Sequence, residues 1–265
     1  MNHKARKRFG QNFLIDNNII DLIVQTIHPE ADQTLIEIGP GLGALTYPLL
    51  KKAGKLQVIE LDRDVIPLLE KKCADAGELT VHNIDVLQFD FSTLVNENNK
   101  LRIVGNLPYN ISTPILFKLL DYSEHIQDMF FMLQKEVVKR MAAEPDSGAY
   151  GRLSIMLQYH CKVTDLFGVP PEAFDPMPRV DSAIVNLQPR KPEIEVSNYP
   201  LLEAIVKQAF SMRRKTIRNT LKKTCSAEDL EAVGINPKHR PENIPPALYY
   251  KLCNHLDQKT TDKTS

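Results

Sequence analysis

The sequence lacks a long apolar run. Its apolar stretches, such as the one over residues 129–133, are far shorter than the roughly 20 residues that a membrane-spanning helix needs. The basic N-terminus is not followed by the apolar core of a secretory signal peptide. We therefore expect a cytoplasmic protein that does not enter the membrane.

Clustered cysteine and histidine are also missing. Four cysteines lie far apart without a C-x-x-C pair, and the seven histidines form no H-E-x-x-H motif. We interpret the cysteines as free thiols and the histidines as solvated or core residues. The sequence therefore predicts no metal site.

The chain has no net charge, which argues against a polyanionic partner because phosphate neutralisation supplies much of the affinity for nucleic acids. This average conceals two basic segments without acids, at residues 2–8 and 207–223. Their cations are Lys4, Arg6, Lys7 and Arg8, then Lys207, Arg213, Arg214, Lys215, Arg218, Lys222 and Lys223. The local field governs binding, so we predict that these residues bind RNA. The alternatives are a solvated tail and a solvated helix face.

Residues 34–133 alternate short β-branched runs with segments of helical length and period, which is typical of a parallel sheet built from βαβ units. The expected strands cover residues 34–38, 56–61, 79–82, 101–104 and 128–133. Two more, 163–169 and 181–187, are expected to close the sheet in antiparallel fashion.

The proline-rich segment 188–200 is typical of a linker and divides the chain. We predict a first domain over residues 1–190, a small helical RNA-binding domain over 191–256 and a disordered tail over 257–265. Within the helical domain, the apolar spacing predicts a helix over 201–223.

A glycine-rich turn follows the first expected strand, with Gly39, Gly41 and Gly43 in the segment EIGPGLG. Glycines there let the backbone approach a ligand closely. Glu60 ends the next strand, where an acid can accept hydrogen bonds from both ribose hydroxyls of an adenosine cofactor. NAD and S-adenosylmethionine both contain adenosine. The pattern G-x-G-x-G differs from the G-x-G-x-x-G that seats a pyrophosphate and so favours S-adenosylmethionine.

Asp85 follows the third strand and is predicted to accept a hydrogen bond from the adenine amine of the cofactor; the alternative is a helix cap.

The segment NLPY after the fourth strand is predicted to be catalytic. The amine of adenine is a poor nucleophile, so a transferase must orient its lone pair toward the methyl group. The Asn106 side-chain oxygen and the Leu107 carbonyl can accept the amine hydrogens, Pro108 fixes the backbone, and Tyr109 can stack on the base. The alternative is an ordinary turn.

A base inside folded RNA must be extruded to reach this segment, and a second aromatic face would offset part of the unstacking cost. Phe174 is our candidate for that face; the alternative is a hydrophobic plug.

Six motifs over nearly the whole chain resemble the ribosomal RNA small-subunit adenine dimethyltransferases, the family associated in bacteria with kasugamycin sensitivity. The motifs are RFGQNFL (8–14), EIGPGLG (37–43), VIELD (58–62), NLPYNIS (106–112), FDPMPRVDSAIV (174–185) and QAFSMRRKTIRNTL (208–221). The resemblance implies an α/β class I methyltransferase (Rossmann-like) fold, with a mostly parallel seven-stranded sheet and a small all-α C-terminal domain.

The same resemblance implies a function. It places cofactor contacts at Asn12, Leu14, Gly39, Glu60, Asp85 and Asn106, to which the glycine turn adds Gly41. It implies a monomer that uses S-adenosylmethionine to dimethylate N6 of two adjacent adenosines near the 3′ end of 16S ribosomal RNA, in a partly assembled small subunit.

Three alternatives stay open. A large-subunit methylase of the macrolide-resistance type shares the cofactor and catalytic segments, but the C-terminal basic motif argues against it. A non-catalytic ribosomal RNA-binding assembly factor is disfavoured because Asn106, Tyr109 and Glu60 are intact. An NAD dehydrogenase lacks a suitable His or Tyr constellation.

Overall fold

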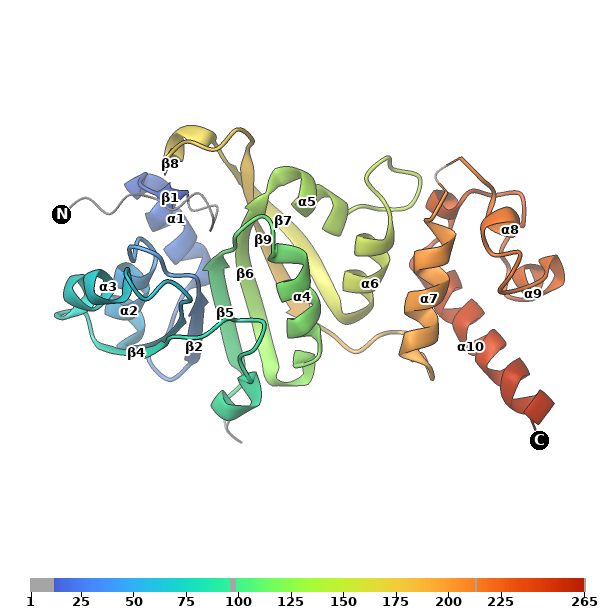
Figure 1. Ribbon diagram of the computed structural model, residues 1–265, viewed down its shortest axis with the longest axis horizontal. Helices are drawn as coiled ribbons and strands as arrows, with labels where there is room; N and C mark the ends of the chain where they lie inside the picture. The colour runs from blue at the N-terminus through green and yellow to red at the C-terminus, as the bar shows by residue number, and fades with distance from the viewer. Residues whose placement is uncertain (1–11, 96–98, 213, 265) are drawn as a thin grey trace. The chain divides into compact units, whose positions relative to one another are not determined.

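The computed structural model describes residues 12–95, 99–212 and 214–264, whose contacts divide them into two compact units (Figure 1). The first unit contains the described residues up to Val138 and residues 162–189, and the second contains residues 139–161 and those from Arg190 onward. The expected boundary after residue 190 thus lies beside a unit boundary, but the second unit also includes residues 139–161. The Tyr150 hydroxyl gives one physical reason, since it donates to the Ile244 carbonyl at 2.9 Å.

A seven-stranded sheet in the order β4-β3-β2-β5-β6-β9-β7 forms the centre of the first unit. The first five strands of this order are parallel to one another, and β9 runs antiparallel to β6. This confirms the mostly parallel α/β fold. The strands are β2 (Thr34–Ile38), β3 (Lys55–Ile59), β4 (Glu78–His82), β5 (Leu101–Asn106), β6 (Ile126–Gln134), β7 (Cys161–Val169) and β9 (Ser182–Pro189).

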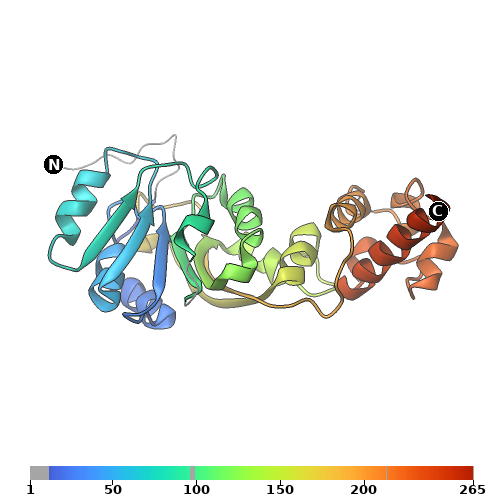
Figure 2. The same ribbon diagram turned by 90° about the horizontal axis from the view of Figure 1, so that it is seen from below.

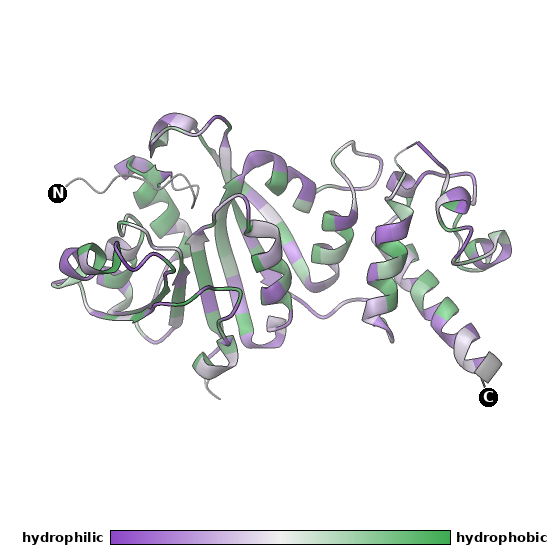
Figure 3. Cartoon of the chain, in the orientation of Figure 1, coloured by the Kyte–Doolittle hydropathy of each residue, from purple (hydrophilic) through white to green (hydrophobic). Residues whose placement is uncertain are grey.

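Helices cover both faces of this sheet, which explains why its central strands are continuous apolar runs. Figure 2 shows α1 on one face and α4 on the other, and Figure 3 shows the apolar strands between them. The helices of this unit are α1 (Asn17–Ile27), α2 (Thr46–Ala53), α3 (Ile66–Cys73), α4 (Ser112–Leu120), and the 3-10 turns η2 (Phe91–Leu94), η3 (Ser123–His125) and η4 (Pro171–Ala173).

Helix α1 follows from its sequence. Asp16 caps its start by accepting the N–H groups of Asn18 (2.8 Å) and Ile19 (3.2 Å). Buried apolar residues recur at helical spacing along α1, so one face of this helix packs into the hydrophobic core of the first unit. Just before this helix, β1 (Phe13–Leu14) forms a short antiparallel pair with β8 (Phe174–Asp175), which connects the start of the described chain to the segment before β9.

The second unit consists of helices. Helix α5 (Lys135–Met141) crosses the unit boundary, and α6 (Arg152–His160), α7 (Tyr199–Ala209), α8 (Ile217–Thr220), α9 (Ala227–Ala232), η5 (Pro241–Asn243) and α10 (Pro246–Thr264) follow. Its core contains Tyr249, whose fully buried ring keeps its hydroxyl satisfied by donating to the Pro241 carbonyl at 2.8 Å.

Two expectations for this unit are wrong. The helix expected over 201–223 is interrupted, because α7 ends at Ala209 and a turn precedes the one-turn helix α8. The Gln208 side chain donates to the Thr220 carbonyl at 3.0 Å, so the chain folds back on itself. The tail expected to be disordered over 257–265 is helical up to Thr264 as part of α10, where Asp257 accepts hydrogen bonds from Ser197 and Asn198.

Within the described ranges, the helices are all too short or too polar to cross a bilayer. The same part of the chain shows no group of three or more His, Cys, Asp or Glu side chains that could hold a metal ion.

Candidate active site

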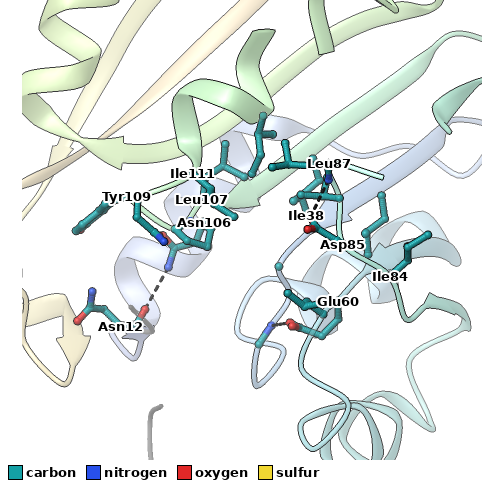
Figure 4. A pocket seen from close by; sticks show the side chains of 18 of the residues that line it. Asn12, Ile38, Glu60, Ile84, Asp85, Leu87, Asn106, Leu107, Tyr109 and Ile111 are labelled. Carbon is teal, nitrogen blue, oxygen red and sulfur yellow. Dashed lines mark hydrogen bonds between the residues drawn. The ribbon is translucent and has the colours of Figure 1, made fainter. Parts of the chain in front are cut away.

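A cavity of about 260 Å³ opens at the carboxyl end of the parallel strands, where the loops after β2, β3, β4 and β5 meet (Figure 4). It brings together most of the predicted cofactor-binding and catalytic residues. Figure 4 shows Asn106 and Tyr109 on one side and Glu60 and Asp85 on the other. The predicted residues that line it are Asn12, Gly39, Gly41, Glu60, Asp85, Asn106, Leu107, Pro108 and Tyr109.

The glycine turn after β2 has a backbone conformation that favours glycine. Gly39 and Gly41 have φ values of +69° and +52°, a region that residues with a side chain rarely adopt. A Cβ atom on Gly41 would lie 3.2 Å from the Phe13 ring. The turn therefore presents its backbone to the cavity, with the Phe13 ring beside it.

Glu60 holds the glycine turn in place. One carboxylate oxygen accepts the Gly41 N–H at 3.2 Å and the other accepts the Asp62 N–H at 2.8 Å. The side chain is buried, and this burial raises the pKa of the Glu60 carboxyl, while these backbone hydrogen bonds oppose the shift. A ligand hydroxyl at this position meets an acceptor whose direction the backbone has already fixed.

Asp85 lies across the cavity from the turn over residues 106–109, which the sequence predicts to be catalytic. Its carboxylate accepts the Leu87 N–H at 2.9 Å and thereby closes the turn after β4. Asp85 therefore caps a turn rather than a helix, and it also lines the cavity; its hydrogen bond to a cofactor's adenine amine stays a prediction.

The predicted catalytic turn, residues 106–109, begins at the last residue of β5 and leads toward α4. The Leu107 N–H donates to the Met132 carbonyl of β6 at 3.2 Å. The Asn106 amide nitrogen donates to the Asn12 carbonyl at 3.2 Å, a bond that leaves the acceptor oxygen of this amide unused. The Tyr109 hydroxyl is hydrogen-bonded to that of Ser182 at 2.8 Å.

Gly105 brings this turn close to the glycine turn. A Cβ atom at Gly105 would lie only 2.5 Å from the Ile38 carbonyl oxygen, a distance that real Cβ atoms do not tolerate. A Cβ atom on Gly39 would lie 3.8 Å from the Asn106 carbonyl. The carboxyl ends of β2 and β5 are therefore in close backbone contact at the cavity.

Sequence reasoning missed the apolar walls of the cavity. Side chains of Phe13, Ile38, Ile84, Leu87, Ile111 and Ile115 line it. Several of them directly neighbour a predicted polar residue, and that adjacency is the signal that could have identified them. Such walls suit the flat face of an adenine ring.

Glu37 was also missed. It lies in β2 below the glycine turn, is 2% exposed, and its Oε2 has no hydrogen-bond partner among the described residues. Burial raises the pKa of Glu37 to about 7; nearby Glu60 adds to this, while Thr46 and Lys72 oppose it. An acid in the middle of an otherwise apolar strand was the available signal.

Two predicted residues do not line the cavity. Leu14 and Phe174 face each other across the β1–β8 pair and belong to the buried core, with 6% and 3% exposure. The structure therefore places Phe174 as a hydrophobic plug rather than a second face beside Tyr109.

The predicted RNA-binding cations divide into two groups. Lys4, Arg6, Lys7, Arg8 and Arg213 lie outside the described residues. Of the others, Lys207 lies on α7 and Arg218 on α8, whereas Arg214 and Lys215 occupy the turn between these helices and Lys222 and Lys223 follow α8. All six are exposed, and no carboxylate of the described chain lies within 4 Å of them as an ion-pair partner.

Comparison with known proteins gives consistent matches. A family model described as ribosomal RNA adenine dimethylase matches residues 2–258. The ribosomal RNA small subunit methyltransferase A of Pseudomonas aeruginosa is 54% identical over 255 residues, which cover 96% of this chain and 95% of that protein. The protein of the same name from Vibrio cholerae is 52% identical over 265 residues, covering 100% and 97%.

Two solved structures are similar over nearly the whole chain. A dimethyladenosine transferase from Plasmodium falciparum aligns with a TM-score of 0.79 and 26% identity, covering 94% of this chain and 98% of that one. The 23S rRNA methyltransferase ErmE aligns with a TM-score of 0.72 and 26% identity, covering 93% and 100%.

Proposed function

The chain belongs to the ribosomal RNA adenine dimethylase family, and from this premise we propose that it dimethylates N6 of two adjacent adenosines near the 3′ end of small-subunit (16S) ribosomal RNA. One observation supports this most directly. The turn from Asn106 to Tyr109 and the acids Glu60 and Asp85 line the same cavity, so a place for a nucleoside cofactor adjoins a place for an adenine amine.

S-adenosylmethionine is the cofactor of this family, and the residues present fit it. Glu60 suits the ribose hydroxyls, Asp85 suits the adenine amine, and the backbone of Gly39 and Gly41 leaves room for the amino acid portion. The apolar walls between them suit the adenine ring. When bound, the cofactor supplies a methyl group on a sulfonium, which is already activated for transfer.

The chain's own task is to orient the acceptor. The Asn106 side-chain oxygen is not used by its bond to Asn12 and can accept one amine hydrogen of the target adenine. The Leu107 carbonyl can accept the other, which directs the lone pair of the amine toward the methyl group. Such alignment of two reactants lowers a barrier by about 7 to 11 kcal/mol. Because the sulfonium donor is already activated and the surplus proton of the methylated amine leaves to water after transfer, the transfer itself requires no general base or metal.

Tyr109 provides a ring on which the extruded adenine can stack. Because Phe174 is buried in the core, a sandwich between two aromatic rings needs Phe174 to leave that core when RNA binds. Stacking on Tyr109 alone requires no such change.

The exposed cations of the second unit are the proposed contact to RNA phosphates. We further propose that the protein acts as a cytoplasmic monomer on a partly assembled small subunit, in which the paired adenosines are presented together. Binding to such a particle would also give the protein a role in late ribosome assembly.

Methylation of large-subunit RNA is the second candidate, because the fold of ErmE is also similar. Sequence identity argues against it. The chain is 54% identical to a small-subunit methyltransferase and 26% identical to ErmE over comparable lengths. A binding factor without turnover is disfavoured because the catalytic turn is intact and lines the cavity.

The decisive experiment offers methyl-labelled S-adenosylmethionine with undermethylated small subunits and, separately, with large subunits. We expect N6,N6-dimethyladenosine in digests of the small-subunit RNA. Label in the large-subunit RNA would support the second candidate. Absence of label in both, with cofactor binding intact by calorimetry, would refute the proposal in favour of a binding factor.

A further inference from the structure

The hydrogen bond between Tyr109 and Ser182 connects two distant parts of the first unit. Tyr109 belongs to the catalytic turn after β5, and Ser182 is the first residue of β9, on the far side of β6 in the sheet. The hydroxyl oxygens lie 2.8 Å apart. Ser182 is fully buried, whereas Tyr109 is partly exposed at the cavity, so the serine end of this bond is shielded from water.

The backbone of Tyr109 is already fixed by local hydrogen bonds. The Ile111 N–H donates to the Pro108 carbonyl at 3.2 Å, and the Ser112 hydroxyl donates to the Tyr109 carbonyl at 3.3 Å. These contacts leave the ring free to turn about its side-chain torsions. The bond to Ser182 is the contact that holds the far end of the ring.

Ser182 is itself held rigidly. It is paired with Gln134 in the register of β6 and β9, and the next backbone bond, from the Lys135 N–H to the Asp181 carbonyl, measures 3.0 Å. A buried strand residue with these neighbours cannot follow a moving side chain, so it serves as a fixed point for the Tyr109 ring.

We propose that Ser182 is a positioning residue for methyl transfer, which sets the plane of the Tyr109 ring against the extruded adenine. The proposal rests on the proposed function. Tyr109 is the aromatic residue on the catalytic side of the described cavity, while Phe174 is buried, so the orientation of one ring decides how the base is aligned.

The test is a double-mutant cycle with Ser182→Ala and Tyr109→Phe, each of which removes one hydroxyl and retains the remaining side chain. We expect each variant to lower kcat for labelling of undermethylated small subunits by about 2- to 12-fold, the range for one hydrogen bond. Because both remove the same bond, the double variant should be no slower than the slower single variant. The KM for S-adenosylmethionine should not change.

Two matched controls separate this role from simple loss of a hydroxyl. Tyr122→Phe removes a tyrosine hydroxyl that donates to Asp90 away from the cavity, and Ser154→Ala removes a buried serine hydroxyl in the second unit. Both should keep the wild-type kcat. Thermal unfolding of every variant shows whether a slower rate reflects a lost fold; if Ser182→Ala does not fold, Tyr109→Phe tests the same bond.

A wild-type kcat in Ser182→Ala or in Tyr109→Phe, or fold-changes that multiply in the double variant, would overturn the inference while the wild-type enzyme still forms N6,N6-dimethyladenosine. If the wild-type protein forms none, the proposed function fails and the inference fails with it.

Discussion

Buried charged residues at the two ends of the seven-stranded sheet differ in whether they have an ion-pair partner. At the amino end, Arg102 of β5 is 5% exposed and fully partnered: it donates to both carboxylate oxygens of Asp128 at 2.9 Å. It also donates to Gln33 at 2.7 Å and to the carbonyls of Ile27 at 2.7 Å and His28 at 3.2 Å. This arginine therefore attaches the end of α1 to the sheet.

At the carboxyl end, buried acids have no such cation. Glu37 has an oxygen without a partner among the described residues, and Glu60 relies on backbone N–H groups. Removing one partner of a buried ion pair destabilises the fold because an uncompensated charge remains, whereas a buried acid that lines a cavity, as Glu60 does, can still meet a ligand. The comparison assigns stability to the first end and function to the second.

The largest effect is expected at the amino end. Arg102→Met leaves Asp128 buried without its cation, and this should lower the free energy of unfolding by about 3 to 5 kcal/mol, as measured by urea denaturation. Replacing both residues, as Arg102→Met with Asp128→Leu, should recover part of the loss because no isolated charge then remains. Equal stability of the single variant and the wild type would contradict the comparison.

Replacing Glu37 is expected to raise the free energy of unfolding at neutral pH, whereas replacing Arg102 lowers it. Burial raises its pKa from the ordinary value of 4.5 to about 7, so the folded protein holds this proton more tightly than the unfolded chain. The stability it contributes is complete below pH 4.5 and is lost as the pH rises to about 7, a change of about 3 kcal/mol. Glu37→Gln should remove this dependence.

The measurement is urea unfolding of both proteins from about pH 3.5 to about pH 8, a range that brackets the two pKa values. The variant should match the wild type at the acid limit and exceed its stability at the alkaline limit. Parallel curves would show that Glu37 keeps its charge in the folded protein.

Two variants at the carboxyl end should separate transfer from binding. Asn106→Ala should lower kcat by about 10²-fold, because the acceptor amine loses its alignment, with little change in cofactor affinity. Glu60→Ala should instead weaken cofactor binding by about 10-fold, the effect of one charge-assisted hydrogen bond. Calorimetry with S-adenosylmethionine checks both, and equal loss of affinity in the two variants would refute the division of roles.

The smallest effect is expected for the exposed cations of the second unit, which lie at neither end of the sheet. Replacing Arg214 and Lys215 by Ala should weaken RNA binding and lower the slope of log K against log salt by about 0.7 to 0.9 for each phosphate that the variant no longer neutralises. The control is Lys55→Ala, whose exposed cation is paired with Glu78 at 3.0 Å in the first unit. An unchanged slope for the double variant would place the RNA-binding surface elsewhere.

The sequence predicted the carboxyl end of the sheet better than the amino end, for a physical reason. Glycines, Asn106 and Glu60 lie directly after short apolar strands, and parallel strands bring such positions to one edge. The Arg102–Asp128 pair joins two strands at positions that look like ordinary surface charges in the sequence. Only the packed structure shows that they are buried together.

The remaining errors have a similar cause. Apolar spacing over residues 201–223 suits a helix, but the bond from Gln208 to Thr220 favours a turn, and periodicity cannot reveal such a contact. The polar composition of residues 257–265 suggested disorder, whereas Asp257 in α10 accepts hydrogen bonds from the residues just before α7. The burial of Phe174 depends on pairing between β1 and β8, two-residue strands that are too short to predict.

The absence of a side chain at Gly105 has a consequence for how this site tolerates change. If the proposed mechanism holds, main-chain atoms of β2 and β5, rather than interchangeable side chains, set the distance between the methyl donor and the acceptor amine. Substitutions among the apolar residues that line the cavity can therefore change the affinity for the cofactor without changing this distance. A single methyl group at position 105 would displace the loops after β2 and β5 together.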